Sequence, residues 1–455
     1  MNKKNINFKI FKAYDIRGIY PSELNREAVF AIGRAFARKT RAKQVVVGRD
    51  MRLSGSILKK YLIQGLAQEG VREIIDIGLV PIDAVYFSVG ILKYEAGIVI
   101  TASHNPKEYN GLKMVRRSVD DMDWVRGNDL ARIVQKVNTG GKNVGNGEIK
   151  IIKKNIYPEY IRHVLSFVNV KNIKPLKVVI DAGNGMAGKV MPILEKYLPI
   201  KTIHLNYRLD GNFPAHPSNP LLPESQVQIS KKIKETKADC GVIFDGDTDR
   251  LFFVDEDGKF IRADITLLLL AKLFLEREAG AGIAYNLICS KIVPKMIEQW
   301  GGRAIRTAVG FVNVAQGMKK NKGIMGGEVS AHYSFRDNTY ADSGFIALVI
   351  LLELLSEIDK PLSQIVKPFY AYHKLPEINT LVEDIDEKIE EIKNKYKRCS
   401  QDYLDGVTVD NWEKRGWWFN VRPSNTEPLL RLTIEAKDKK MTMKLKKDLV
   451  KLIKK

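Results

Sequence analysis

Gly97-Ile98-Val99-Ile100-Thr101-Ala102-Ser103-His104-Asn105-Pro106 joins a short apolar run to a loop of small and polar residues. Two similar runs, Val45–Val47 and Ile74–Ile77, precede it, and amphipathic helical patterns separate the three runs. Short Val- and Ile-rich runs between such helices indicate strands of a sheet that is buried on both faces. The first part of the chain is therefore predicted to be a βαβ domain.

The same rhythm returns twice further along the chain. A second series begins at Lys177–Asp181, continues through a helical stretch over 190–197 and reaches the apolar run Val242–Phe244. A third series opens after the turn Asp255–Gly258. Its predicted elements are helices over 265–277 and 345–355 and an apolar strand over 285–289. Three α/β units in series are predicted.

The stretch from Lys374 to Lys455 has a different pattern. Its predicted elements are a helix over 385–397, strands over 406–409, 417–421 and 429–436, and a basic terminal helix. This order is typical of a small α+β domain. We predict four domains, over residues 1–157, 158–257, 258–369 and 370–455, of which the first three are α/β.

Composition narrows the class of protein but does not choose its partner. With 455 residues the chain is long enough for about three domains, and 45% hydrophobic residues can fill their cores. The 74 Lys and Arg against 53 Asp and Glu give a net charge of +21. Such a charge attracts nucleic acid, anionic membranes and phosphorylated metabolites alike. The lysine-rich segment 439–455 lacks interleaved aromatic residues, so we expect a solvated helix face and no nucleic-acid partner.

Cysteine usage and hydropathy favour a cytoplasmic protein. Cys240, Cys289 and Cys399 lie far apart without a CxxC pair, which argues against a disulfide framework or a structural zinc site. Apolar stretches such as Phe345–Leu352 are much shorter than the ~18 to 20 residues of a membrane span. Residues 1–11 are basic but lack an apolar signal-peptide core. We expect a reducing environment and no membrane partner.

Four loops carry candidate chemistry. The first follows the run Gly97–Ile100, and at the carboxyl end of a strand Ser103 could be a nucleophile or a phosphate carrier. Ser, Asn and Pro are also ordinary turn formers, and no GxSxG elbow surrounds Ser103. On this loop alone both interpretations stay open.

The second loop, Asp245-Gly246-Asp247-Thr248-Asp249-Arg250, also follows an apolar run. Carboxylates at alternate positions of an extended chain project to one side, where they repel one another unless a cation lies among them. Oxygen ligands of this kind suit Mg²⁺. An EF-hand would place Glu256 at its twelfth position, but Arg250 stands where its glycine is required. A magnesium site is predicted.

The third and fourth loops suit binding of a phosphorylated sugar. Gly326-Gly327-Glu328-Val329-Ser330-Ala331-His332 carries hydrogen-bonding side chains at alternate positions, which suits neighbouring hydroxyls, although a buried strand with a satisfied histidine would look similar. Arg422-Pro423-Ser424-Asn425-Thr426-Glu427-Pro428 lies between two predicted strands. A guanidinium with hydroxyl and amide donors in one turn is a phosphate cradle, and a plain hairpin loop is the alternative.

In order and spacing, the four loops resemble those of the α-D-phosphohexomutases, from Phe11–Gly18 to Arg422–Pro428. Asp210-Gly211-Asn212-Phe213-Pro214 and the run from Gly327 to Asp337 resemble the phosphomannomutase/phosphoglucomutase branch. The resemblance implies three mixed-sheet α/β domains and a smaller C-terminal domain around a central active-site cleft. It also implies an isomerase that interconverts hexose 1-phosphates and 6-phosphates through a phosphoserine and a hexose 1,6-bisphosphate.

The resemblance further implies a role for each candidate residue. Ser103 is the expected phosphoserine and, with the three aspartates, a ligand of Mg²⁺. The other expected catalytic residues are Lys113, Arg17, Arg250 and His104; the expected metal ligands are Ser103, Asp245, Asp247 and Asp249. The expected substrate-binding residues are Tyr14, Glu328, Ser330, His332, Arg422, Ser424, Asn425 and Thr426.

Two positions depart from the family pattern. Ile288 stands where relatives carry Lys or Arg in a strand, with Lys291 as a possible substitute, and Phe311 stands where they often carry His. The departures leave the choice between mannose and glucose open. The alternatives are a phosphoglucosamine mutase, a phosphatase with Asp245 as nucleophile, or a non-catalytic binder of phosphosugar or nucleic acid.

Overall fold

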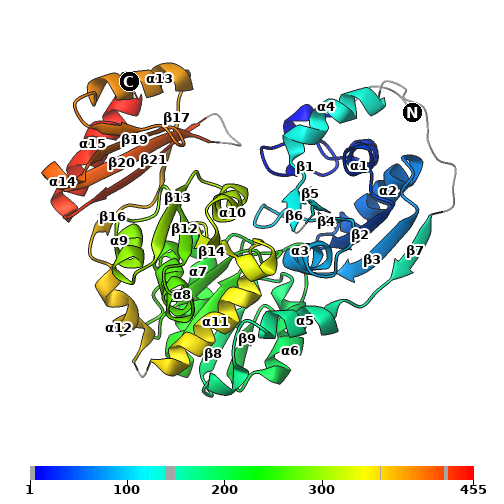
Figure 1. Ribbon diagram of the computed structural model, residues 1–455, viewed down its shortest axis with the longest axis horizontal. Coiled ribbons are helices and arrows are strands. Elements are labelled where there is room, and N and C mark those ends of the chain that lie inside the picture. The colour runs from blue at the N-terminus through cyan, green and yellow to red at the C-terminus, as the bar shows by residue number, and fades with distance from the viewer. Residues whose placement is uncertain (1–5, 120, 139–148, 359, 425–428, 455) are drawn as a thin grey trace. The chain divides into compact units, whose positions relative to one another are not determined.

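The computed structural model of the chain describes residues 6–119, 121–138, 149–358, 360–424 and 429–454 (Figure 1). Its contacts divide the chain into two compact units. The first unit comprises residues 1–262 and 331–363, and the second comprises residues 263–330 and 364–455. The third predicted domain, 258–369, is shared between them, and the four domain boundaries stay a prediction.

The first sheet of the first unit is mixed. Its strands follow the order β1-β5-β4-β2-β3-β7, with β6 beside β5. β2 is parallel to β3 and β4, whereas β5 is antiparallel to β1 and β4. The strands are β1 (Ile16–Ile19), β2 (Gln44–Arg49), β3 (Glu73–Leu79), β4 (Ala96–Ile100), β5 (Tyr109–Arg117), β6 (Met122–Trp124) and β7 (Lys150–Lys153). The predicted βαβ domain is thereby confirmed.

Helices cover this sheet. They are η1 (Phe8–Ile10), α1 (Arg26–Thr40), α2 (Gly55–Gln68), α3 (Ile82–Gly90) and α4 (Gly127–Asn138). α1 begins where the Asn25 side chain accepts a 2.8 Å hydrogen bond from the amide of Ala28, a helix cap. It ends at Arg41 in the left-handed region. Its buried face packs on α2, while α3 contacts β2, β4 and β5 (Figure 1).

A second mixed sheet, of order β11-β10-β8-β9, follows in the first unit. β8 is parallel to β9 and β10, and β10 and β11 form an antiparallel hairpin. The strands are β8 (Lys177–Asp181), β9 (Lys201–Leu205), β10 (Cys240–Phe244) and β11 (Leu251–Val254). The helices are α5 (Tyr157–Leu165), η2 (Val170–Asn172), α6 (Ala187–Leu194), η3 (Glu195–Tyr197) and α7 (Pro223–Thr236).

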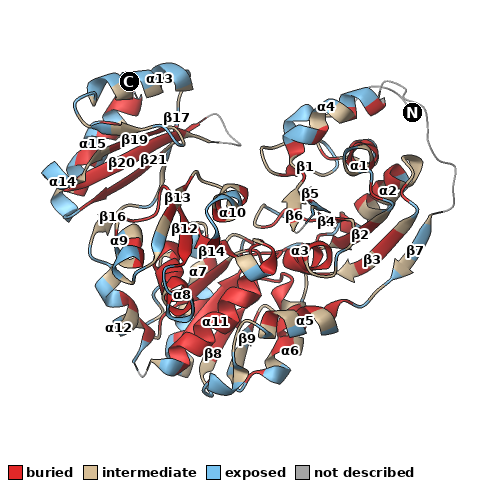
Figure 2. Ribbon diagram, viewed as in Figure 1, coloured by how far each residue is buried: buried red, intermediate tan, exposed pale blue. Residues whose placement is uncertain are grey.

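Later segments complete the first unit. They are β15 (Tyr333–Phe335), η4 (Arg336–Asn338) and α11 (Gly344–Glu357). α11 is buried along almost all of its length (Figure 2) and contacts α5, η2 and β11. A helix that is apolar on every side must be covered on every side. This explains why a segment so late in the chain lies within the first unit.

The second unit contains three strands of a sheet with the order β13-β12-β14-β15, in which β12 is parallel to both of its neighbours, and an antiparallel sheet. In the former, β12 (Gly282–Asn286) lies between β13 (Arg303–Thr307) and β14 (Gly323–Gly327). Its helices are α8 (Ala263–Arg277), α9 (Ile292–Gln299) and α10 (Phe311–Lys320), and α12 (Leu362–Val366) and η5 (Lys367–Phe369) follow later in the chain. β12 ends at Asn286, so the prediction of a strand through residue 289 is wrong and Ile288 lies in the following turn.

The C-terminal sheet has the order β16-β21-β20-β19-β18, with β17 beside β21. Its strands are β16 (His373–Lys374), β17 (Ile378–Leu381), β18 (Ser400–Asp402), β19 (Val407–Asn411), β20 (Trp417–Pro423) and β21 (Leu429–Ala436). The helices are α13 (Ile385–Lys395), α14 (Trp412–Arg415) and α15 (Lys439–Lys454). Phe419, Leu432 and Leu449 are fully buried in the core between sheet and helices. The predicted fold class, three α/β domains followed by a smaller α+β domain, is confirmed.

Within the described part of the chain, none of the helices combines the length and apolarity needed to cross a membrane.

Candidate active site

Ser103 lies in the loop that begins at the carboxyl end of β4. Its backbone is in the left-handed region, with φ of 50°, and its amide donates to Oγ1 of Thr101 at 3.0 Å. The side chain is fully buried, and its hydroxyl donates to Oδ2 of Asp245 at 2.6 Å. Nδ1 of His104 lies 3.2 Å from the same hydroxyl oxygen. The local geometry presents the serine hydroxyl to an acidic group and a ring nitrogen.

The acidic loop, Asp245 to Asp249, follows β10 and meets Ser103. A carboxylate oxygen from each of its three aspartates lies within 4.8 Å of the others. The chain here is a turn, with the Thr248 amide donating to the carbonyl of Asp245 at 3.3 Å, and not the extended segment that alternate spacing predicts. The turn, rather than a strand, gathers the three carboxylates.

The buried carboxylates repel one another electrostatically. Burial, with the neighbouring charges of Asp249 and Asp247, raises the pKa of Asp245 well above its usual range. Burial alone would also raise the pKa of Asp249, but the cations of Lys113, His332 and Arg250 lower it well below that range. Positive charge close by is therefore what allows this cluster to ionise.

Lys113 supplies part of that charge from β5. The register pairs Lys113 with Val99 of β4, which brings the lysine to the acidic loop. Its ammonium lies 3.1 Å from Oδ2 of Asp247 and also contacts Oδ2 of Asp249. Although burial alone would lower the pKa of Lys113, these two carboxylates raise it. The lysine is a fixed cation of the site.

The acidic loop fits a divalent cation. Oδ1 of Asp247 is buried and has no hydrogen-bond partner among the residues that the structure describes. Such an atom is costly unless something binds it. Its Oδ2 accepts hydrogen bonds from Thr101 and Lys113, so of its two oxygens only Oδ1 is unpaired. Three carboxylates with one unsatisfied oxygen are a donor set suited to a hard cation.

Two arginines and a tyrosine were also predicted to belong here. Arg17 of β1 forms an ion pair with Asp15 at 2.8 Å, and its guanidinium lies 3.5 Å from the carbonyl of Ala102. Nε of Arg250 lies 3.9 Å from Asp249. The guanidinium carbon of Arg126 lies over the ring of Tyr14, 5.8 Å from the ring centre. Burial and the charges of Arg250 and Arg17 lower the pKa of His104 well below its usual value.

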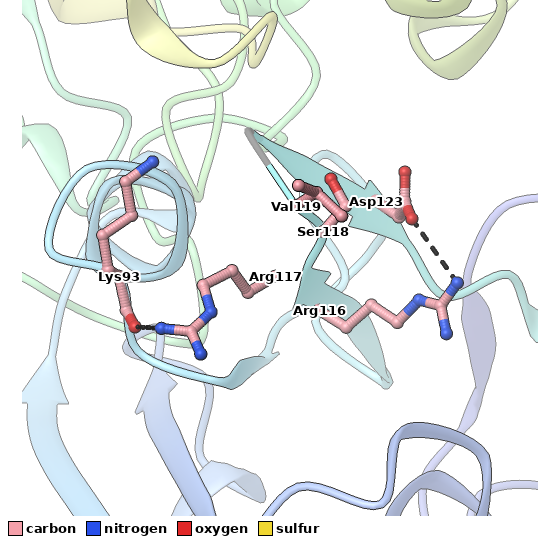
Figure 3. Close-up of a pocket in the computed structure, with 6 residues that line it drawn as sticks. All are labelled: Lys93, Arg116, Arg117, Ser118, Val119 and Asp123. Atoms are coloured by element: carbon pink, nitrogen blue, oxygen red, sulfur yellow. Dashed lines mark hydrogen bonds and ion pairs between the residues drawn. The ribbon is translucent and has the colours of Figure 1, made fainter.

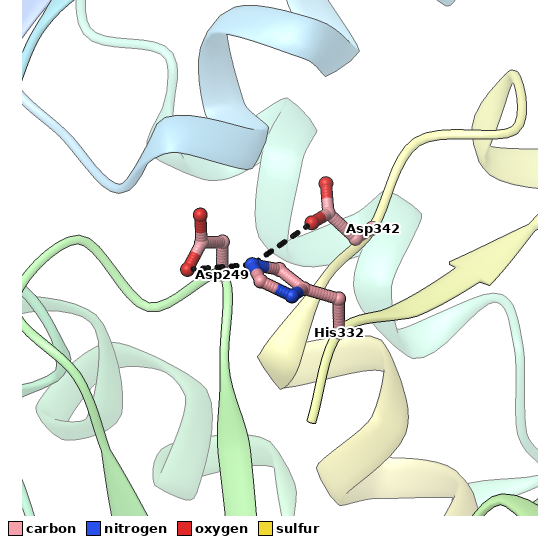
Figure 4. Close-up of side chains that lie close together, drawn as sticks. All are labelled: Asp249, His332 and Asp342. Carbon is pink, nitrogen blue, oxygen red and sulfur yellow. Dashed lines mark ion pairs between the residues drawn. The ribbon is translucent and has the colours of Figure 1, made fainter. Parts of the chain in front are cut away.

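His332 lies between two buried carboxylates (Figure 4). Its Nε2 is 3.5 Å from Oδ1 of Asp249 and 3.9 Å from Oδ2 of Asp342. Burial raises the pKa of Asp342 to about 7, while the charge of His332 opposes the shift. His332 was predicted to bind the sugar, and its contact with the acidic loop was not. Asp342, which forms a β-bridge with Ser334, was missed because no sequence motif marks the segment before α11.

Glu328 and Ser330 of the third loop lie together in the second unit. Oε1 of Glu328 accepts hydrogen bonds from Nδ2 of Asn286 at 3.1 Å and from the amide of Gly310 at 2.7 Å. The Ser330 hydroxyl donates to Oε2 of Glu328 at 3.3 Å. Glu328 is 2% exposed, so it is a fixed acceptor rather than a mobile surface acid. Asn286, its partner at the end of β12, was not predicted.

Only part of the fourth loop lies within the described residues. Asn425 and Thr426 fall outside them. Nη2 of Arg422 forms a 2.6 Å ion pair with Glu377, which also pairs with Arg431 at 3.2 Å. Arg431 in turn donates to the hydroxyl of Ser424 at 3.1 Å. Glu377 and Arg431 were missed because they lie outside the motif, just before β17 and within β21.

The two departures from the family pattern lie in the second unit. Ile288 is 3% exposed, and Phe311 is the first residue of α10. Lys291, the possible substitute cation, contacts Oδ2 of Asp410. Its charge is therefore already partly compensated.

An open hollow of about 630 Å³ lies beside β5 and β6 (Figure 3). Arg116 pairs there with Asp123 at 3.5 Å, and Arg117 donates to the carbonyl of Lys93. None of the predicted site residues lines it. The candidate active site is thus defined by converging side chains rather than by this hollow.

Comparison with known proteins matches four successive parts of the chain to the phosphoglucomutase/phosphomannomutase family. Residues 9–123, 158–258 and 262–372 match its α/β/α domains I, II and III, and residues 377–452 match its C-terminal domain. The chain belongs to this family. As a phosphohexomutase it is an isomerase of hexose phosphates, which confirms the function predicted from the four loops.

Individual relatives of this phosphohexomutase cover nearly its whole length. A phosphomannomutase of Vibrio cholerae is 39% identical, with 98% of each chain covered. A Xanthomonas campestris protein named phosphohexose mutases is 38% identical, covering 94% of this chain and 95% of its own. A crystal structure of a phosphoglucomutase/phosphomannomutase family protein from Burkholderia thailandensis superposes with a TM-score of 0.88 at 31% identity, covering 99% of this chain and 98% of the other.

Proposed function

We propose that this phosphohexomutase interconverts the 1-phosphates and 6-phosphates of mannose and glucose, with Ser103 as the phosphoryl carrier. The observation that carries the proposal is the buried Ser103 hydroxyl, 2.6 Å from Asp245 in the acidic loop. The name phosphomannomutase, which several relatives carry, supports mannose as the preferred sugar.

The first half of the reaction transfers phosphate from Ser103 to the sugar. The bond between Oγ and phosphorus breaks as a bond forms between phosphorus and a sugar hydroxyl. The proton of that hydroxyl passes to a basic group, and Oγ takes up a proton as it leaves. The resulting hexose 1,6-bisphosphate turns around. Oγ of Ser103 then attacks the other phosphate and its proton passes to His104, whose Nδ1 lies 3.2 Å away. The bond between phosphorus and the sugar oxygen breaks, and that oxygen takes up a proton. Such catalysis depends on positioning and charge neutralisation.

The charged side chains have separate tasks. Asp245, Asp247 and Asp249 would hold Mg²⁺, with an oxygen on Ser103 as a further ligand. When bound, Mg²⁺ supplies positive charge to the phosphoryl oxygens. Lys113, whose ammonium lies 3.1 Å from Oδ2 of Asp247, adds a second positive charge and would also handle the proton of the sugar hydroxyl. Arg17 and Arg250 lie beside the same loop and stabilise the transferring group.

Glu328, Ser330 and the fourth loop act on the sugar phosphate. Asn286 and Gly310 hold Glu328 as an acceptor for sugar hydroxyls. Arg422, Ser424, Asn425 and Thr426 bind the phosphate that is not being transferred. His332 contributes to the sugar end through the loop that it shares with Ser330.

A coupled assay with mannose, glucose and glucosamine 1-phosphates tests the proposal. Conversion of mannose and glucose 1-phosphates to 6-phosphates is expected, with stimulation by glucose 1,6-bisphosphate. A preference for glucosamine 1-phosphate would instead identify a phosphoglucosamine mutase. Steady release of inorganic phosphate would indicate a phosphatase, and binding without turnover a non-catalytic protein; either result would reject the proposal.

A further inference from the structure

Arg52 lies in the loop after β2, far from Ser103 in the sequence, and its guanidinium contacts the Ser103 loop. The residue is 1% exposed. Its Nη1 donates to the carbonyls of Pro106 at 2.7 Å and Tyr109 at 2.9 Å. Its Nη2 donates to the carbonyls of Ser103 at 2.8 Å and Asn105 at 2.6 Å. One buried side chain thus binds four carbonyls of a single loop.

These contacts supply what the loop lacks. A serine with φ of 50° is in a region that residues with a side chain seldom adopt, so its conformation needs support from outside the loop. Buried carbonyls outside regular structure also need donors. A planar guanidinium with five N–H groups in a rigid fork can serve several acceptors at once, which the ammonium of lysine cannot do in the same geometry.

A second layer of residues holds Arg52 in turn. Asp50 lies 3.3 Å from its Nε and accepts from its amide at 2.9 Å. The ring of Phe213 lies 5.1 Å below the guanidinium carbon. A Cβ on Gly211 would come within 3.0 Å of the Arg52 Cα, so only glycine allows this close approach. The Asp210–Pro214 motif thereby gains a physical role that its sequence does not reveal.

Ser218 approaches the same carbonyl from another side. Its hydroxyl donates to the carbonyl of Ser103 at 3.2 Å. The carbonyl of Ser103 is therefore held by two donors from segments on either side of it in the sequence, Arg52 and Ser218. A shift of that peptide would move Oγ of Ser103 relative to Asp245.

We propose that Arg52, assisted by Ser218, is a positioning residue for phosphoryl transfer: it fixes the backbone of Ser103 so that Oγ meets the acidic loop. This inference rests on the proposed role of Ser103 as the phosphoryl carrier. Arg52 acts through the loop and does not touch the substrate. A displacement of about 1 Å of a reacting group can cost about 100-fold in rate. We therefore expect substitution of Arg52 to lower kcat rather than to raise KM.

The test compares Arg52→Lys and Ser218→Ala with Arg34→Lys in the full chain. Arg34 is a matched control, a buried arginine of the same unit that pairs with Glu69 and donates to the carbonyl of Val137. For Arg52→Lys, kcat should fall by between about 10- and 100-fold, with KM close to that of wild type and a loss of melting temperature no greater than that of Arg34→Lys. Phosphorylation of Ser103 by glucose 1,6-bisphosphate, followed by intact mass, should slow in parallel. Ser218→Ala should show a smaller fall, and Arg34→Lys should retain its kcat.

Each other outcome counts against the proposal. An unchanged kcat in Arg52→Lys, while Ser103→Ala is inactive, overturns the role of Arg52 and leaves that of Ser103 intact. An active Ser103→Ala enzyme would instead remove the proposed function itself. Equal losses in Arg52→Lys and Arg34→Lys would indicate a general structural effect and also overturn the proposal. If Arg52→Lys does not fold, Ser218→Ala decides, because an unaltered kcat there overturns the assisting role of Ser218 that is part of the proposal.

Discussion

The hydroxyl of Ser103 donates a 2.6 Å hydrogen bond to Oδ2 of Asp245, across 142 positions of the sequence. The contact joins the ends of two strands in different sheets, β4 and β10, so it depends on the packing of the first unit as a whole. Since the hydroxyl faces the acidic loop directly, this oxygen is where a phosphoryl group would meet a bound cation.

Replacement of Ser103 by Ala should therefore remove the hydroxyl that carries the phosphoryl group. We expect a phosphate-sized mass on the wild-type protein after incubation with glucose 1,6-bisphosphate, and none on Ser103→Ala, measured by intact mass. Turnover should fall by several orders of magnitude, because the covalent route is lost. Ser118→Ala, at the edge of the same sheet, is the control and should behave as wild type. A fully active Ser103→Ala enzyme would exclude this serine as the carrier.

Removal of the metal should stop turnover. Excess EDTA is expected to abolish activity and added Mg²⁺ to restore it, because the buried carboxylates require positive charge. Asp247→Asn removes one charge where Oδ1 has no described partner. The Mg²⁺ concentration for half-maximal rate should rise by at least about tenfold, since even outer-shell partners change metal affinity by about 10- to 100-fold.

The control for this prediction is Asp257→Asn, which removes an exposed acid of the turn after β11. It should leave the Mg²⁺ dependence unchanged. Full activity in excess EDTA, with no metal found by elemental analysis, would contradict the assignment of the acidic loop.

Asn286 should control how tightly the sugar is held. Its side chain donates to Oε1 of buried Glu328 at 3.1 Å. Asn286→Leu removes a donor to a charged group, worth ~1.5 to 3 kcal/mol, or roughly 10- to 150-fold. We expect this loss chiefly as a higher KM for the hexose 1-phosphate, measured by steady-state kinetics. Asn321→Ala, at the exposed end of α10, should leave KM unchanged; an equal rise there would point to general destabilisation.

Local patterns in the sequence were sufficient to predict the strands that precede the Ser103 loop and the acidic loop. The run Gly97–Ile100 indicates a buried strand whatever lies beside it, and Ser103 follows that strand at once. The same holds for Val242–Phe244 and the aspartates after it. Because ligands gather at carboxyl ends of strands, short-range information placed both halves of the acidic site.

The missed residues depend on contacts between distant segments. Arg52 reaches Ser103 across 51 positions, and Asp342 lies in a segment that no motif marks. The sequence pattern predicted that α11 belongs to the third α/β domain. In the structure the helix contacts α5, η2 and β11, which belong to the first compact unit. Packing in three dimensions decides such pairings, and the spacing of residues along one segment carries no information on them.

Asp83 should make stability depend on pH. It lies in the first turn of α3, where burial raises its pKa to about 7 although Ser343 and Tyr160 donate to it. The folded protein thus retains a proton that the unfolded chain loses near pH 4. This group stabilises the fold fully below about pH 4, and its contribution declines as pH rises toward 7, by about 4 kcal/mol in all.

Thermal unfolding of wild type and Asp83→Asn between pH 4.5 and 7.5 tests the direction of this pH dependence of stability. Asparagine keeps an acceptor for Tyr160 and Ser343 but cannot ionise. The melting temperature of wild type relative to the variant should therefore decline across this range and level off above pH 7. A parallel pair of curves, or a relative rise of the wild type, would show that the Asp83 pKa is not raised.

Discrimination between mannose and glucose should be modest. The two sugars differ at the C2 hydroxyl, and Glu328, the buried acceptor proposed for the sugar, is not committed to that position. A site rejects an analogue by ~10⁴ or more only when a buried polar group is left unpaired. We therefore expect both 1-phosphates to be converted, mannose 1-phosphate faster. The measurement is kcat/KM for both substrates under identical conditions.

Ile288→Lys tests whether the departure from the family pattern sets this ratio. Ile288 is 3% exposed in the turn after β12. A lysine at this buried position could destabilise the fold, so the melting temperature of the variant is measured as a check on folding. If an apolar side chain here removes a contact with the substrate, the variant should gain kcat/KM, with Ile288→Met as the control of similar size. An unchanged value in a folded variant would exclude Ile288 as a determinant. A wild-type ratio beyond about 10⁴ in either direction would reveal a buried C2 contact and refute dual specificity.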